Sequence, residues 1–309
     1  MEDYPRTMVE FEERFATETA CRAYLQRLRW PEGFRCPKCK GTEAWTTERD
    51  LYHCGACGFQ VSVTAGTIFH RSRKPLALWF RAMWQITSQK YGANALGLQR
   101  VLGLGSYHTA WEWLHRLRRA MVRPGRDRLA GVVEVDESYV GGERPGKRGR
   151  GAENKALVMV AVEDKSQGQK KEMGRIRLRR VPDASAESLQ GFIVANVEPG
   201  SMIRTDGWDG YNQISKEGFR HEVVRKTNVI GDDPLPACHR VISLFKRWLL
   251  GTYQGAVQPE HLDYYLDEFT FRFNRRSSQS RGKLFLRLVQ QAAETAPISR
   301  HRIEGGSSC

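Results

Sequence analysis

Four cysteines form two pairs whose spacing suits metal binding. Cys36 and Cys39 make one CxxC pair, and Cys54 and Cys57 make a second, with 14 residues between the two pairs. Two such pairs let four thiolates close a tetrahedron around one soft cation. We predict a structural Zn²⁺ here, with an iron site or reduced thiols as the alternatives. A site closed by four cysteines leaves no open position for catalysis, so the metal replaces the core that so short a module lacks.

Two aspartates follow apolar, strand-like segments. Asp136 ends the run 132–135, and Asp206 ends the run 202–205. Carboxylates at the tips of adjacent buried strands can share two divalent cations about 4 Å apart, a pair that activates water or a 3′-hydroxyl and stabilises the leaving oxygen of an attack on phosphorus. Taken singly, each aspartate is better explained as a turn former at a strand end. The order of elements between them favours the paired site.

That order comes from the hydrophobic patterns along the chain. Residues 8–30 predict one or two amphipathic helices, and residues 75–121 are helical with a break at 103–106. Past residue 130 the sequence changes to a pattern rich in β-branched residues, in which strand-like and helix-like segments are mixed. It predicts strands over 132–136, 156–162, 176–181 and 201–205, a helix over 185–197, and later helices over 236–250 and 259–275.

Residues 95–102 and 107–119 flank a glycine-containing turn and together predict a helix-turn-helix. Its second helix carries Arg116, Arg118 and Arg119, which we expect to contact DNA. The alternative is an ordinary helical hairpin packed on the next domain, and the segment by itself does not decide between them. The neighbouring cysteine module favours DNA contact.

Charge supports a polyanionic partner. The 309 residues include 49 Lys and Arg against 35 Asp and Glu, a formal net charge of +14. The excess falls in runs at 71–74, 116–128 and 147–150 rather than evenly, as expected of a protein that binds nucleic acid. Neither a signal peptide nor an apolar stretch of membrane-spanning length is visible, so we expect a cytoplasmic, nucleoid-associated protein with no membrane partner.

Three segments carry a resemblance to a known family: residues 134–142, 205–208 and 265–276. They resemble bacterial insertion-sequence transposases that join a zinc ribbon to a DDE-type core, a group related to the eukaryotic Merlin transposons. The resemblance covers about residues 10–290. It implies a ribonuclease H-like core, catalytic Mg²⁺ or Mn²⁺, and recognition of terminal inverted repeats in double-stranded DNA by a homo-oligomer.

The third catalytic position departs from the family pattern. The resemblance implies a glutamate seven residues before a lysine; Lys246 fits that lysine, and His239 stands at the glutamate position. A spacing of seven places His239 and Lys246 on one helical face, the first as a ligand or base and the second against the DNA backbone. A surface or helix-start histidine is the alternative. Asn274 and Glu268 are held in reserve for this role.

These patterns predict a multidomain chain with a zinc ribbon, a helix-turn-helix segment and a mixed α/β ribonuclease H-like core with a C-terminal helical part. The expected boundaries are 1–70, 71–125, 126–300 and a disordered tail at 301–309. The expected activity is DNA transposition on element ends and target DNA. The alternatives are a zinc-ribbon regulator, an inactive transposase-derived DNA binder, and a ribonuclease H-like nuclease without joining activity.

Overall fold

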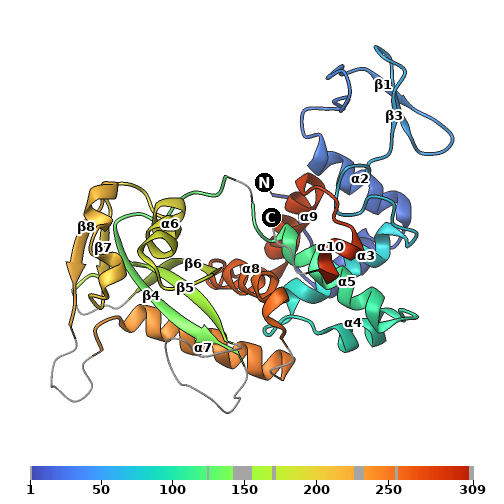
Figure 1. Ribbon diagram of the computed structural model, residues 1–309. Coiled ribbons are helices and arrows are strands. Elements are labelled where there is room, and N and C mark those ends of the chain that lie inside the picture. The colour runs from blue at the N-terminus through green and yellow to red at the C-terminus, as the bar shows by residue number, and fades with distance from the viewer. Residues whose placement is uncertain are drawn as a thin grey trace. The chain divides into compact units, whose positions relative to one another are not determined.

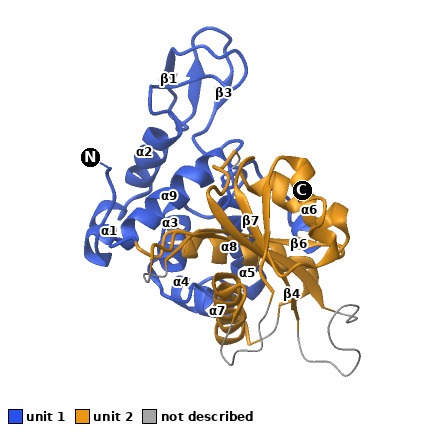
Figure 2. Ribbon diagram, turned by 90° about the vertical axis from the view of Figure 1, so that its left-hand side faces the viewer, with its two compact units in different colours: residues 1–123, 278–305 blue, residues 124–277, 306–309 orange. Residues whose placement is uncertain are grey.

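The computed structural model describes residues 2–123, 125–141, 155–168, 172–225, 233–254 and 257–305. The chain divides into two compact units (Figure 2): unit 1 holds Met1–Arg123 and Ser278–Gly305, and unit 2 holds Pro124–Ser277 and Gly306–Cys309. The basic run at 147–150 and the last four residues, 306–309, lie outside the described residues.

Unit 1 is built from helices around an aromatic cluster. The ring of Phe285 lies at its centre, with ring centroids 5.4–6.4 Å from those of Phe11, Phe15, Tyr24, Phe80 and Trp84. The helices are α1 (Met8–Arg14), α2 (Glu18–Arg29), α3 (Leu76–Ser88), α4 (Ala95–Leu102), α5 (Tyr107–Ala120), α9 (Arg281–Glu294) and α10 (Arg300–Glu304).

The C-terminal boundary of the core differs from the expected one. Helix α9 packs against α2, α3 and α5 in unit 1, so the segment 278–305 is not part of the core that we expected to run to residue 300. The expected tail also begins inside a helix, since α10 reaches Glu304 and Ile303 is fully buried. The physical reason is the apolar face of α9, which completes the aromatic cluster of unit 1.

A three-stranded antiparallel sheet lies between α2 and α3 in the chain. It consists of β1 (Ala44–Thr46), β2 (Tyr52–Cys54) and β3 (Gln60–Val61), in that order. Its small core gathers around Phe34, Cys36, Cys54 and Val61. The Arg29 guanidinium donates to the carbonyls of Ser62, Val63 and Ala65, which ties the exit of the sheet to α2.

Unit 2 is organised around a mixed five-stranded sheet (Figure 1). The strands, in the order β6-β5-β4-β7-β8, are β6 (Met173–Val181), β5 (Ala156–Asp164), β4 (Val132–Val140), β7 (Met202–Thr205) and β8 (Arg220–Val223). Strand β5 is antiparallel to both of its neighbours, β6 and β4, whereas β7 pairs in parallel with β4 and β8 in parallel with β7. An antiparallel meander extended by two parallel strands is the arrangement of the ribonuclease H-like fold, as expected.

Helices cover both faces of this sheet because both faces are apolar. One face buries Val133, Val135 and Ile203 against α6 (Ala186–Asn196) and the short helices η1 (Asp209–Tyr211) and η2 (Ile214–Glu217). The other buries Val158 and Val160 against α7 (Pro236–Tyr253) and α8 (Leu262–Phe273), which follows η3 (Pro259–His261). Alternate residues of a strand therefore serve two separate cores.

The predicted strands and helices of the core are present, with one addition and one correction. Strand β8 was not predicted, because the polar segment 220–223 has no apolar pattern. Strand β4 does not end at Asp136 as expected: it continues to Val140, because β5 pairs with it as far as the Val140–Ala156 pair. Within the described ranges, no helix is both long and apolar enough to cross a membrane.

Candidate active site and zinc centre

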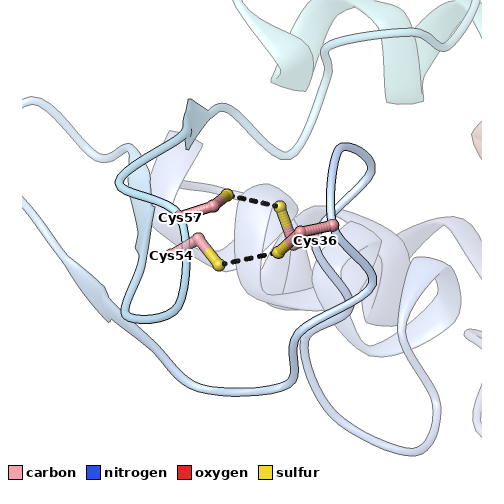
Figure 3. Close-up of side chains that lie close together, drawn as sticks. Cys36, Cys54 and Cys57 are labelled. Carbon is pink, nitrogen blue, oxygen red and sulfur yellow. Dashed lines mark hydrogen bonds between the residues drawn. The ribbon is translucent and has the colours of Figure 1, made fainter.

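The four predicted cysteines meet at one point in unit 1. The Sγ atoms of Cys36 and Cys57 lie 3.7 Å apart, and those of Cys39 and Cys54 lie 3.6 Å apart (Figure 3). All four sulfur atoms are within 4.8 Å of one another. A tetrahedron with Zn–S bonds of about 2.3 Å has sulfur–sulfur edges of about 3.8 Å, so the donor set and its spacing fit a structural Zn²⁺.

The two turns that carry the cysteine pairs have the same backbone conformation. The residue after each second cysteine has a positive φ, 66° at Lys40 and 67° at Gly58. The turns are closed by matching bonds, because the N–H of Lys40 donates to the carbonyl of Cys36 and that of Gly58 to the carbonyl of Cys54, each at 2.9 Å. A lysine in this conformation carries strain that the turn geometry and the sulfur ligands hold in place.

Asp136 and Asp206 come from neighbouring parallel strands. Glu134 on β4 pairs with Arg204 on β7, the last pair between these strands, and Asp136 and Asp206 each stand two residues further along, Asp206 directly after the last residue of β7. Asp136 therefore lies in the middle of β4, at the level where its parallel neighbour stops. The Asp136 side chain is 14% exposed, whereas Asp206 is an exposed residue.

A tight turn holds the backbone at Asp206. Gly207 has φ 87°, and a Cβ there would meet Cγ1 of Val223 at 2.5 Å, so only glycine fits. The N–H of Gly207 donates to Oγ1 of Thr205, and the N–H of Trp208 donates to Oδ1 of Asp206. The carboxylate is thus held on a fixed turn while it remains open to solvent.

The electrostatics around Asp136 favour a bound cation. Burial raises the pKa of Asp136 to about 6, and the carboxylates of Glu137 and Asp206 add to this shift. The backbone N–H of Glu137 and the imidazole of His239 act in the opposite direction. Carboxylate oxygens gathered in a partly desolvated position repel one another, and a divalent cation relieves that repulsion.

His239 lies in the first turns of α7, directly beside Asp136. Its Nε2 is 3.4 Å from Oδ2 of Asp136, and its Nδ1 is 2.5 Å from Oδ1 of Asp233. Each ring nitrogen of His239 thus faces a carboxylate, and the contact with Asp233 fixes the orientation of the imidazole beside Asp136. Asp233 was not singled out from the sequence, although it stands only three residues before the first residue of the helix.

Glu134 positions α7 and was also missed. Its side chain is buried, with 2% of the residue exposed, on the same face of β4 as Asp136. Oε2 accepts the N–H groups of Ala237 at 2.9 Å and Cys238 at 3.0 Å, the residues directly before His239. A glutamate inside a β-branched run is the signal that could have revealed it, because a buried carboxylate needs donors.

Lys246 lies further along the same helix. Burial and the ammonium group of Lys155 lower its pKa, and the Asp136 carboxylate raises it. The lysine is thus within electrostatic reach of Asp136 while remaining an exposed residue. The structure brings Asp136, His239 and Lys246 to one region, with Asp206 on the adjacent strand.

The two other candidates for the third catalytic position, Asn274 and Glu268, have partners of their own in unit 2. Asn274 pairs with the backbone of Ile176 on β6, accepting its N–H at 2.7 Å and donating to its carbonyl at 3.1 Å. Glu268 is fully buried and bonded to Arg272 and Tyr253. Strand β5 separates β6 from β4 in the sheet order, so Asn274 anchors an edge strand instead of joining Asp136.

The arginines expected to contact DNA are mostly covered. Arg118 is 1% exposed and therefore does not reach the surface of unit 1, which corrects the expectation. Arg116 is held by Glu112 at 2.5 Å and donates to the carbonyl of Ile68. Arg119 is half-buried. Two helices flank the glycine-containing turn, α4 and α5, as expected both for a helix-turn-helix and for an ordinary helical hairpin, and the exposed end of α5 is at Tyr107 and His108.

Two segments of the chain are similar to known protein families. Residues 128–274 match the ISXO2-like transposase domain, and residues 16–60 match a transposase zinc-ribbon domain. A segment similar to a transposase zinc ribbon thus precedes a segment similar to an ISXO2-like transposase domain. The transposase domain contains Asp136, Asp206 and His239, and the zinc-ribbon match contains all four cysteines.

Two further proteins are similar to the whole chain or to much of it. An uncharacterized protein in the transposable element ISH50 of Halobacterium salinarum is 29% identical over 304 residues, covering 90% of this chain and 98% of the relative. A chain of the simian T-cell lymphotropic virus intasome in complex with PP2A regulatory subunit B56 gamma matches with a TM-score of 0.29 and 14% identity. That match covers 66% of this chain and 74% of the intasome chain.

Proposed function

We propose that this chain is an active DNA transposase that binds the terminal inverted repeats of its element and performs metal-dependent strand cleavage and strand transfer. The observation that carries the proposal is that Asp136 and Asp206 each stand two residues past the Glu134–Arg204 pair of neighbouring parallel strands, with His239 3.4 Å from Asp136. We further propose that it works as a homo-oligomer on DNA, at the nucleoid in the cytoplasm.

Each residue has a distinct part in this chemistry. Asp136, Asp206 and His239 would hold Mg²⁺ or Mn²⁺, which activates the attacking oxygen and stabilises the leaving one when bound. Asp233 fixes the imidazole through Nδ1, and Lys246 holds a DNA phosphate.

Two displacements at phosphorus make up the proposed reaction. In the first, water forms a bond to phosphorus as the bond to the 3′-oxygen breaks, which frees a 3′-hydroxyl at the element end. In the second, that 3′-hydroxyl displaces a 3′-oxygen in the target DNA, so no covalent bond between protein and DNA forms at any stage.

The test compares carboxylate variants on one substrate. Asp136→Asn and Asp206→Asn should lose cleavage and strand transfer by orders of magnitude while binding to terminal-repeat DNA persists, because a ligand and its charge are lost but the DNA surface is not. Asp183→Asn, an exposed carboxylate in the same unit, is the matched control and should keep full activity.

The same assay separates the competing functions. Full strand transfer by Asp206→Asn would refute the two-metal site, and cleavage without joining by the unmodified protein would indicate a nuclease. A protein that binds DNA but never cleaves it would be a regulator or an inactive derivative. His239→Ala should be nearly as damaging as Asp136→Asn, whereas His239→Glu should retain activity because it restores a charged ligand.

A further inference from the structure

Acidic residues are missing from a long part of unit 1. Residues 51–111 contain six Lys and Arg and not one Asp or Glu. The stretch includes the second cysteine pair, α3, α4 and the start of α5. Unit 1 carries 24 Lys and Arg against 13 Asp and Glu, whereas unit 2 carries 25 against 22, so most of the excess charge of the chain belongs to unit 1.

A groove of about 500 Å³ lies at the beginning of this stretch. It is bordered by α2, the loop after β1, the segment 62–75 and the first turns of α3. Four cations line it: Arg22, Arg49, Arg73 and Lys74. The last three are exposed residues, and in the part of the chain that the structure describes no ion pair holds their side chains.

The acidic groups in the groove are already bound. Glu18 accepts the N–H groups of Leu76 at 3.0 Å and Ala77 at 3.1 Å, which caps the start of α3. Arg22 pairs with both Glu18, at 3.4 Å, and Asp50, at 3.1 Å. Arg22 and the helix start therefore balance the two carboxylates, and the positive charge of Arg49, Arg73 and Lys74 is left uncompensated.

The floor of the groove is rigid and connects it to the predicted helix-turn-helix. Trp79 lines the groove, donates from Nε1 to Oγ of Ser72 at 2.9 Å, and stacks on Trp113 of α5 with ring centroids 3.9 Å apart. A cation-lined wall fixed to α5 can set the position of a ligand that α5 also contacts. The buried Arg118 cannot supply that charge from α5 itself.

We infer that this groove seats the phosphate backbone of duplex DNA through Arg49, Arg73 and Lys74. The identity of the partner rests on the proposed function, and the site rests on the groove. A duplex presents one negative charge per about 1.7 Å of its axis, so three uncompensated cations in one groove can meet successive phosphates. An acidic peptide fits less well, because the acid-free stretch extends far beyond the groove along α3 and α4.

The experiment measures duplex binding by the full-length, zinc-loaded protein as a function of salt. Each phosphate contact contributes a slope of about −0.9 in log K against log[salt], so Arg73→Glu/Lys74→Glu should flatten the slope by roughly 2 and weaken binding about 60-fold at 0.1 M salt. The neutral pair Arg73→Gln/Lys74→Gln should give the same loss of slope. Arg6→Glu/Arg27→Glu changes the charge of unit 1 equally with exposed residues outside the groove, and its slope should stay unchanged.

The outcomes separate the groove from the proposed function. Equal slopes for the groove and control variants would overturn the groove site, even where the unmodified protein binds and cleaves DNA. Equal inhibition of DNA binding by polyglutamate and by competitor DNA would assign the groove to acidic peptides and overturn it as well. Loss of cleavage in the Asp136→Asn variant has no bearing on the groove, because that variant should bind DNA with the unmodified slope. Zinc content and thermal unfolding confirm that each variant is folded.

Discussion

Replacing Glu134 tests whether a buried carboxylate fixes the start of α7 and, through it, His239. Pro236 begins the helix without an N–H, so Ala237 and Cys238 supply its first two donors, and both bond to Oε2 of Glu134. Glu134→Ala leaves these donors without that acceptor at a site where only 2% of the residue is exposed. Glu134→Gln keeps a carbonyl oxygen of the same reach and loses only the charge.

The magnitudes follow from these contacts. A hydrogen bond to a charged group is worth roughly 1.5–3 kcal/mol, and loss of a helix cap costs roughly 0.5–2 kcal/mol. With the buried methylene groups included, we expect Glu134→Ala to lower the free energy of unfolding of unit 2 by about 3 kcal/mol. Glu134→Gln should cost about 1 kcal/mol, the contribution of a negative charge at a helix N-terminus. For a domain of this size the alanine variant should melt about 6–12 °C lower.

Calorimetry of the full-length variants measures the stability difference, and amide hydrogen exchange across residues 236–242 reports on the first turns of α7. In a cleavage assay well below the melting temperature, Glu134→Gln should remain within a few-fold of the unmodified protein. Glu134→Ala should lose more activity than its unfolded fraction explains, because His239 loses its fixed position. Equal stabilities for the two variants, or unchanged exchange in the alanine variant, would refute the capping role.

Two other predictions concern the zinc ribbon and the edge strand. Native mass spectrometry should find one Zn²⁺ per chain. A strong chelator should raise hydrogen exchange throughout residues 34–61, because the short ribbon core cannot persist without metal. Protection from exchange that survives complete zinc removal would contradict this prediction. Asn274→Ala should destabilise unit 2 by about 1–2 kcal/mol through its two lost bonds to Ile176 while a folded sample still cleaves DNA, and abolished cleavage in a folded sample would return Asn274 to the active site.

Local chemistry explains which parts of the site could be predicted. The four cysteines needed only their spacing, because the knuckle geometry is set within a few residues. Asp136 and Asp206 followed from apolar runs that end in a carboxylate, although β4 in fact continues past Asp136. The charged residue interrupted the apolar pattern, and pairing with β5 carried the strand onward.

Residues whose environment comes from distant segments could not be predicted. Arg118 stands in a basic helical run that is typical of a surface, yet it is buried in a unit where α9, about 160 residues later, packs against α5. The periodicity of α9 indicates an amphipathic helix without naming its partner. The Glu134 cap likewise depends on a helix start about 100 residues away, and only the presence of a glutamate in an apolar run hinted at it.

The return of α9 to unit 1 has a consequence for synthesis on the ribosome. All of unit 2 through Ser277 is translated before α9 emerges, so unit 2 can fold while unit 1 still lacks Phe285, the centre of its aromatic cluster. A nascent chain interrupted before residue 281 would expose Phe11, Phe80 and Trp84 and would be a substrate for chaperones and proteases. Translation to the last helices thus acts as a checkpoint on which copies of the chain complete the core of unit 1.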